Sequence, residues 1–389
     1  MYQILGTYYS IQVIAMIGIN VNNATVNINQ ITFNPSNFKV GNGSSYLFGR
    51  TIQTKSTFVI TDLAIILGNI SNILVLGNTL TSNQDSDFYL FGGIISYIYN
   101  CDITVNNIIV DSYQQLNTQF ISKSGILIGY IGSSLSRIII DKVCFQQNMT
   151  SNTQKFNWFG LIGMNQGNIS LHNAAITLRI NGSYFNCIGI VGSQQLSLLA
   201  EIVNLKTIVS LISQQGQMTA SIFGFGGAQN CTVYNTSLIN SNINTNKDNI
   251  AGFIGYLNSN ITIIDSTILQ TNIQGLNQMV FGSENIGGFI GYINEKHVSI
   301  QNSLIMLTNI SGSYRIGGFI GNYYQSEVQL KSSKVQQVCL NAFDRQVGII
   351  VGCNCNIISI DSIAVQNYIN GVLQTDCVKL LNIWSINGC

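Results

Sequence analysis

Carboxylates recur at the end of a short alternating segment, in Asp62, Asp141, Asp265 and Asp361, and they are the first candidates for chemistry. Paired carboxylates could act as general acid and base in glycoside hydrolysis, and grouped carboxylates could bind calcium. Both kinds of site need neighbouring carboxylates, whereas none of these four falls in adjacent copies of the segment. The position instead predicts a structural column, in which polar side chains tolerate a left-handed corner and hydrogen-bond along the stack. The predicted corner column comprises Asn173, Asn204, Asn235, Asp265, Asn302, Ser332 and Asp361.

Glycines recur in short apolar phrases, of which 287–292 (GGFIGY), 317–322 (GGFIGN) and 251–256 (AGFIGY) are the sharpest. The segment 221–227 (SIFGFGG) could suggest a phosphate-binding loop. Such a loop needs a helix N-terminus and usually a Lys-Ser/Thr pair, and the sequence offers neither here. A tight turn with positive φ, or close stacking of backbones, explains recurring glycines better. The predicted structural glycines are Gly129, Gly163, Gly192, Gly224, Gly255, Gly291, Gly321 and Gly352.

The cysteines and histidines do not form a metal-binding pattern. The 9 cysteines are scattered without a CxxC spacing, and Cys353 and Cys355 are the only close pair. The 2 histidines, His172 and His297, lie in different copies of the repeat. Because a metal needs convergent ligands, the cysteines are predicted to be small buried side chains on strands. Neither a metal nor a cofactor is predicted.

The elements that position these residues follow from a repeat. The glycine phrase and the alternating segment recur about every 31 residues and keep step along the chain, as in a solenoid. Alternating Ile and Val are typical of strands with one buried face, and no stretch has the spacing of an amphipathic helix. We therefore predict an all-β, right-handed parallel β-helix of about eleven coils, since parallel crossovers are nearly always right-handed. Residues 1–389 form a single array with an insertion at 67–87, and the array is expected to be part of a longer one.

The alternation also assigns the two faces of each strand. Ile300 is predicted to point inward and its neighbour Ser299 outward, with Ile263 and Leu330 as the inward equivalents in the adjacent coils. Aromatic residues near the glycines should stack coil on coil, as cross-strand pairs do. Members of the predicted stack include Phe253, Phe289 and Phe319.

Composition argues against several classes of partner. Charged residues make up 8% of the chain and the net charge is +1, without a basic patch, so neither nucleic acid nor an anionic membrane is expected as a partner. Apolar stretches such as 13–19 are shorter than the ~20 residues of a spanning helix, so no membrane span is predicted. No basic residue precedes 13–19, so no secretory signal is visible.

The glycine phrase, with the Asn-rich strand after it, resembles the GLUG repeat, which is named for its Gly-Leu-x-Gly core. The match is literal at 160–163 (GLIG), and Phe or Ile replaces Leu elsewhere. The resemblance covers most of the chain and implies a surface-exposed or secreted solenoid, as in bacterial adhesins and the non-catalytic arrays of immunoglobulin-cleaving metallopeptidases. It implies no catalytic residue, because the His-Glu-x-x-His motif of those peptidases is absent.

The function predicted first is that of a non-catalytic, adhesin-like rod, displayed on a cell surface or secreted. Its variable loops would bind a partner, for which a cell-surface protein and a glycan are both open. About ten Asn-x-Ser/Thr sequons, among them Asn148, Asn181 and Asn309, are compatible with an extracellular location.

The alternative is a carbohydrate-active β-helix protein, a polysaccharide lyase or hydrolase. Such an enzyme would concentrate Asp, Arg, Lys and His on one face over neighbouring coils, whereas the chain has 15 acidic residues and 2 histidines, thinly spread. An ice-binding surface would need a regular Thr-x-Thr stripe, and the Thr/Ser stripe here is interrupted. The sequence therefore favours a binding protein over an enzyme.

Overall fold

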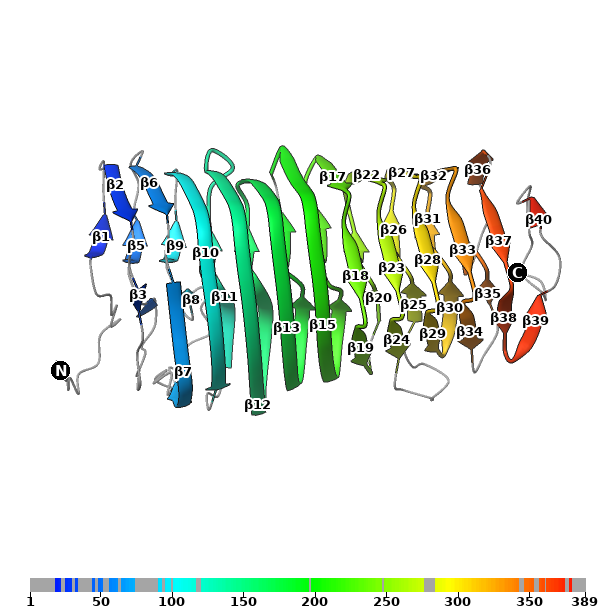
Figure 1. Cartoon of the computed structure of the whole chain (residues 1–389), viewed down its shortest axis with the longest axis horizontal. Coiled ribbons are helices and arrows are strands. Elements are labelled where there is room, and N and C mark those ends of the chain that lie inside the picture. The colour runs from blue at the N-terminus through cyan, green and yellow to red at the C-terminus, as the bar shows by residue number, and fades with distance from the viewer. Residues whose placement is uncertain are drawn as a thin grey trace.

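The chain forms an elongated parallel β-solenoid, in which strands of successive turns lie side by side along one axis (Figure 1). This computed structural model describes residues 120–195, 197–246, 248–275, 284–342 and 346–352. Toward the two ends it describes segments between residues 18 and 116 and between residues 357 and 379. Every element in these ranges is a strand, and no helix long and apolar enough to cross a membrane occurs among them.

Each turn contributes strands to five columns, here called A to E in the order in which the chain visits them. Column A holds the alternating segment, and column E holds the glycine phrase. Between residues 64 and 219, single long strands run through more than one column without a break. These are β7 (Ala64–Ile73), β10 (Cys101–Leu116), β11 (Phe120–Ile131), β12 (Arg137–Asn165), β13 (Asn168–Ile188) and β15 (Leu199–Thr219).

Shorter strands make up the rest of the columns. Column A contains β2 (Thr25–Asn29), β6 (Ser56–Thr61), β17 (Asn230–Tyr234), β22 (Asn260–Ile264), β27 (His297–Gln301), β32 (Glu327–Lys331) and β36 (Ile357–Ile360). Column B contains β3 (Thr32–Phe33), β18 (Ser237–Ile239), β23 (Thr267–Leu269), β28 (Leu304–Met306), β33 (Lys334–Gln336) and β37 (Ile363–Val365). Column C contains β19 (Asn242–Thr245), β24 (Asn272–Gly275), β29 (Asn309–Gly312), β34 (Cys339–Ala342) and β38 (Asn367–Ile369).

The last two columns bring the chain back to the start of the next turn. Column D contains β4 (Ser44–Ser45), β8 (Leu90–Gly92), β20 (Ile250–Ala251), β25 (Glu284–Gly287), β30 (Tyr314–Gly317) and β35 (Val347–Gly348). Column E contains β1 (Gly18–Val21), β5 (Phe48–Thr51), β9 (Ile95–Ile98), β14 (Val191–Gln195), β16 (Phe223–Gly227), β21 (Ile254–Leu257), β26 (Ile290–Asn294) and β31 (Ile320–Tyr324).

The predicted fold class is confirmed, but the number of turns differs from the eleven expected. About seven turns of the solenoid lie in the stretch from β12 to β32, which is described apart from residues 196, 247 and 276–283. Beyond this part, parallel pairing continues through strand segments toward β2 and β36. The eleven copies counted in the sequence include those outside this stretch.

Inward-facing side chains of successive turns stack into one continuous core. Ile300 pairs with Ile263 on one side and Leu330 on the other, and all three are fully buried. Ser299, the neighbour of Ile300, is partly exposed on the opposite face. The predicted register and faces are therefore confirmed, and the predicted aromatic stack is present. Its ring centroids are 4.8 Å apart for Phe253 and Phe289, and 5.4 Å apart for Phe289 and Phe319.

The recurring glycines lie in column E, where parts of the backbone approach one another closely. A Cβ added to Gly291 would lie 2.5 Å from the carbonyl oxygen of Gly255, and one added to Gly321 would lie 2.6 Å from that of Gly291. Among the described glycines, only Gly371 has a positive φ. Close stacking, not a left-handed turn, therefore requires glycine here. The strand pairings place the predicted structural glycines of successive turns next to one another. These glycines are Gly129, Gly163, Gly192, Gly224, Gly255, Gly291, Gly321 and Gly352.

Left-handed corners are occupied mostly by Asn, Gln and Asp. The corner between columns B and C is an example, with φ of 49° at Asn240, 50° at Gln270 and 52° at Gln337. Leu307 holds the same corner with φ 52°, although its side chain has no amide that favours this conformation. The side chain of Leu307 is also 45% exposed, so its partial burial stabilises the fold too little to offset this strain. Leu307 is therefore a point of backbone strain in the solenoid.

Replacing this leucine should stabilise the protein. We expect Leu307→Asn to raise the free energy of unfolding by about 1 kcal/mol, because asparagine visits the left-handed region at lower cost. Denaturant melts of the full chain measure the change. The matched control is Leu135→Asn, since Leu135 is 73% exposed and does not have a positive φ. Equal effects of the two substitutions would show that Leu307 is not strained.

The first part of the insertion expected at 67–87 lies within a strand of the sheet. Leu67, Asn69, Ile70 and Ile73 belong to β7 and pair with β10, with register shifts that mark bulges. The part of the expected insertion from 74 to 87 lies outside the described residues. Bulged strands break the strict alternation of side chains, which is why the sequence pattern was lost here.

The strands after β38 reverse direction. β39 (Val372–Gln374) pairs with β38, and β40 (Val378–Lys379) pairs with β37, both in antiparallel orientation. Elsewhere in the described sheet the strands of successive turns pair in parallel. The edges of β37 and β38 are thereby covered by the chain's own segment, at the right-hand end of the solenoid in Figure 1.

Candidate binding face

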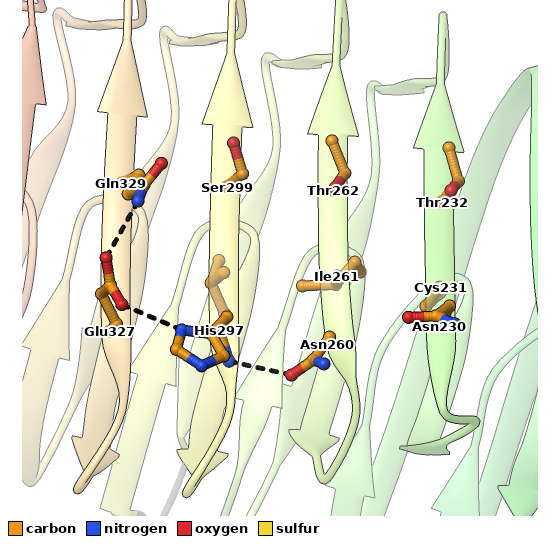
Figure 2. Close-up of a pocket in the computed structure, with 11 residues that line it drawn as sticks. Asn230, Cys231, Thr232, Asn260, Ile261, Thr262, His297, Ser299, Glu327 and Gln329 are labelled. Atoms are coloured by element: carbon orange, nitrogen blue, oxygen red, sulfur yellow. Dashed lines mark hydrogen bonds and ion pairs between the residues drawn. The ribbon is translucent and has the colours of Figure 1, made fainter.

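The outward face of column A carries two parallel rows of polar side chains in β17, β22, β27 and β32. Outward residues alternate with buried ones along each strand. Because the strands are in register, equivalent outward residues of successive turns lie beside one another, about one strand spacing of ~4.8 Å apart. The first row consists of Asn230, Asn260, His297 and Glu327, and the second of Thr232, Thr262, Ser299 and Gln329 (Figure 2).

These two rows line an open hollow of about 410 Å³ on the surface of the sheet. Of the eight row side chains, only those of His297 and Glu327 can carry charge, and the other six are amides or hydroxyls. Between the rows, Cys231, Ile261 and Val298 belong to the buried face of their strands. The hollow therefore presents hydrogen-bonding groups on a rigid sheet and very little net charge.

Hydrogen bonds tie the first row together across the turns. His297 Nδ1 and Glu327 Oε2 are 3.0 Å apart, and the backbone N–H of His297 donates to Asn260 Oδ1 at 3.1 Å. Gln329 Nε2 donates to the other carboxylate oxygen of Glu327 at 2.9 Å. This hydrogen bond, together with His297, lowers the pKa of Glu327. The carboxylate thus stays ionised and already has partners within the protein (Figure 2).

A second His–Glu pair lies on the same column nearer the N-terminus. His172 Nε2 in β13 is 3.3 Å from Glu201 Oε2 in β15, and Ser170 Oγ donates to the same oxygen at 3.4 Å. Both histidines of the chain therefore face outward in column A, each beside a glutamate of the following turn. The sequence places the two histidines in separate repeats, and neither glutamate was among the predicted site residues. Aligning the copies on the alternating segment would have placed each pair in adjacent turns.

An exposed aromatic ring stands at the border of the hollow. Tyr234 ends β17, lies two residues after Thr232 on the same face, and is 41% exposed. Its equivalents in the neighbouring turns are the aliphatic Val203 and Ile264. Tyr234 was not among the predicted site residues, although its alternation with the buried Cys231 and Val233 already marks it as outward-facing.

The predicted corner column borders this face and is held by side-chain amides. Asn204 Nδ2 donates to Asn173 Oδ1 at 2.9 Å, and Asn235 Nδ2 donates to Asn204 Oδ1 at 2.8 Å. Asn173 Nδ2 in turn donates to Asp141 at 2.8 Å. The corner continues with φ of 51° at Asp265, 48° at Asn302 and 49° at Ser332, whereas Asp361 and Asp62 lie outside the described residues.

The cysteines have mixed environments. Cys231 and Cys187 are buried, and burial raises the pKa of the Cys231 thiol to about 12, so this thiol stays protonated. Cys144 is exposed and Cys339 is half-buried, so the prediction of buried strand cysteines is wrong for these two. Both occupy strand positions that alternate with buried neighbours. Within the described ranges, no group of three or more His, Cys, Asp and Glu side chains could hold a metal ion.

Comparisons with known proteins do not assign the chain to a family. No family model matches the chain, and neither a curated protein nor a solved structure matches it. The resemblance to the GLUG repeat therefore rests on its short motif alone.

Proposed function

We propose that this protein is a non-catalytic, adhesin-like rod that acts at a cell surface or outside the cell and holds a partner on its side. One observation carries the proposal. The ionisable groups that line the hollow, His297 and Glu327, are paired with each other within rows of neutral amides and hydroxyls. Such a surface offers many hydrogen bonds, which suits binding, and no free acid–base pair, which hydrolysis would need.

The distance between the paired carboxylates also favours binding over glycoside hydrolysis. Glu201 lies in β15 and Glu327 in β32, which are separated by the intervening strands β17, β22 and β27. Four strand spacings correspond to ~19 Å. Glycosidases place their two carboxylates ~5–9.5 Å apart. The alternative, a polysaccharide lyase or hydrolase, would need a different set of groups.

An attachment assay tests the proposal. Fluorescent beads coated with the full chain are expected to adhere to intact cells or to mucin-coated surfaces, while beads coated with heat-denatured chain do not. Chromatography of the medium should detect no released oligosaccharide during the same incubation. Release of sugar fragments would favour the enzyme, and failure to adhere to any of these surfaces would contradict the adhesive role.

A further inference from the structure

We infer that the hollow on column A binds a linear, neutral polysaccharide that runs along the solenoid axis, across β17, β22, β27 and β32. This inference rests on the proposed function and names its ligand class. Three features of the face support it, namely its charge, its spacing and its single exposed ring.

The first feature is the charge of the hollow. A charged ligand would have to find a free counter-charge, but the carboxylate of Glu327 already accepts a hydrogen bond from Gln329 Nε2 at 2.9 Å and lies 3.0 Å from His297 Nδ1. The remaining row side chains, such as Asn230 and Thr262, are uncharged donors and acceptors. A ligand rich in hydroxyl groups matches this surface, because every hydroxyl both donates and accepts.

The second feature is the spacing of the rows. Equivalent hydroxyl or amide groups recur at each turn, for example at Thr232 and Thr262, one strand spacing of ~4.8 Å apart. A sugar unit in an extended chain is about as long as this spacing, so successive units can meet equivalent groups. An extended peptide rises only ~3.3 Å per residue and falls out of step with the turns. The repeat thus favours a polysaccharide over a peptide.

The third feature is Tyr234, whose 41% exposed ring borders the second row. An aromatic ring offers an apolar face and a polar hydroxyl, and the apolar C–H face of a sugar can pack against it. Its neighbours Val203 and Ile264 are smaller, so the ring stands between two shorter side chains. At Tyr234, a bound polysaccharide therefore gains an apolar packing contact in addition to its hydrogen bonds.

Affinity electrophoresis of the full chain tests the inference. The gels contain a soluble linear β-glucan, a linear mannan or a galactomannan, with heparin and chitosan as charged counterparts. We expect retardation by at least one neutral polymer and by neither charged polymer. For oligosaccharides of that polymer, calorimetry should show affinity rising with length until the chain spans the four strands, about 14 Å.

Variants locate the site. Tyr234→Ala should weaken binding about tenfold, and Tyr234→Phe should retain most of it because the ring face remains. Tyr324→Ala is the matched control, since Tyr324 is 50% exposed but ends β31 in column E, and its affinity should stay within about twofold of the parent chain. Thr262→Lys, which places a charged chain in the centre of the hollow, should also weaken binding.

The outcomes separate the ligand from the function. Equal losses for Tyr234→Ala and Tyr324→Ala would overturn the assignment of the site. If the chain adheres to cells but none of the neutral polymers retards it, the ligand class is wrong while the adhesive role stands. If a polymer binds and is cleaved, the ligand class stands and the non-catalytic function is wrong.

Discussion

Gly224→Ala should strongly destabilise the protein, by about 3 kcal/mol or more in the free energy of unfolding. Gly224 lies in column E, and a Cβ there would come within 2.7 Å of the carbonyl oxygen of Gly192 and the backbone nitrogen of Ile188. It would also lie 2.8 Å from the carbonyl oxygen of Met218. All three atoms belong to the backbone, so no side chain can move aside, and the strands themselves must shift.

Gly226→Ala provides a control within the same strand, β16. The nearest atom to its added Cβ is the side-chain Cδ1 of Leu257, at 3.3 Å, and the next is a side-chain atom of Ile254 at 3.6 Å. A small movement of Leu257 makes room, so the change should stay within ~1 kcal/mol. Denaturant melts of both variants give the comparison. Similar free energies of unfolding for the two would mean that close backbone packing is not what requires glycine at 224.

Ile300→Ala should lower the free energy of unfolding by roughly 2–5 kcal/mol, the range for truncating a fully buried isoleucine. Ile300 is 0% exposed and packs between Ile263 and Leu330 of the adjacent turns. In a solenoid each turn contacts only its neighbours, so the cavity weakens two interfaces at once and none that are remote. Amide hydrogen exchange should therefore rise most in β22, β27 and β32.

Ser299→Ala is the matched control, because Ser299 is the adjacent residue on the outward face. Its Oγ accepts a hydrogen bond from Gln301 Nε2 at 3.0 Å on a partly exposed surface, so its loss should cost within ~0.5 kcal/mol. Denaturant melts compare the two variants under identical conditions. A larger loss for Ser299→Ala than for Ile300→Ala would contradict the inward and outward faces of β27.

The sequence alone determined the fold class and the core register. A period of about 31 residues and the strict alternation around Ile300 are local patterns, and they remain visible without knowing how the turns stack. It also identified the corner column, because asparagine and aspartate tolerate left-handed φ and their repeated position marks a corner. The sequence left open why the glycines recur, because a tight turn and a close approach of two backbones both require glycine.

Only the tertiary structure decided which outward side chains lie next to one another on the surface. His297 and Glu327 meet because parallel pairing brings β27 and β32 into register, and the loops between strands vary in length from turn to turn. The border position of Tyr234 likewise depends on which side chains stand in the turns before and after it. Alternation along one strand is a local property of the chain, whereas a binding face is assembled from several turns. Its chemistry is therefore fixed by stacking, which no single repeat contains.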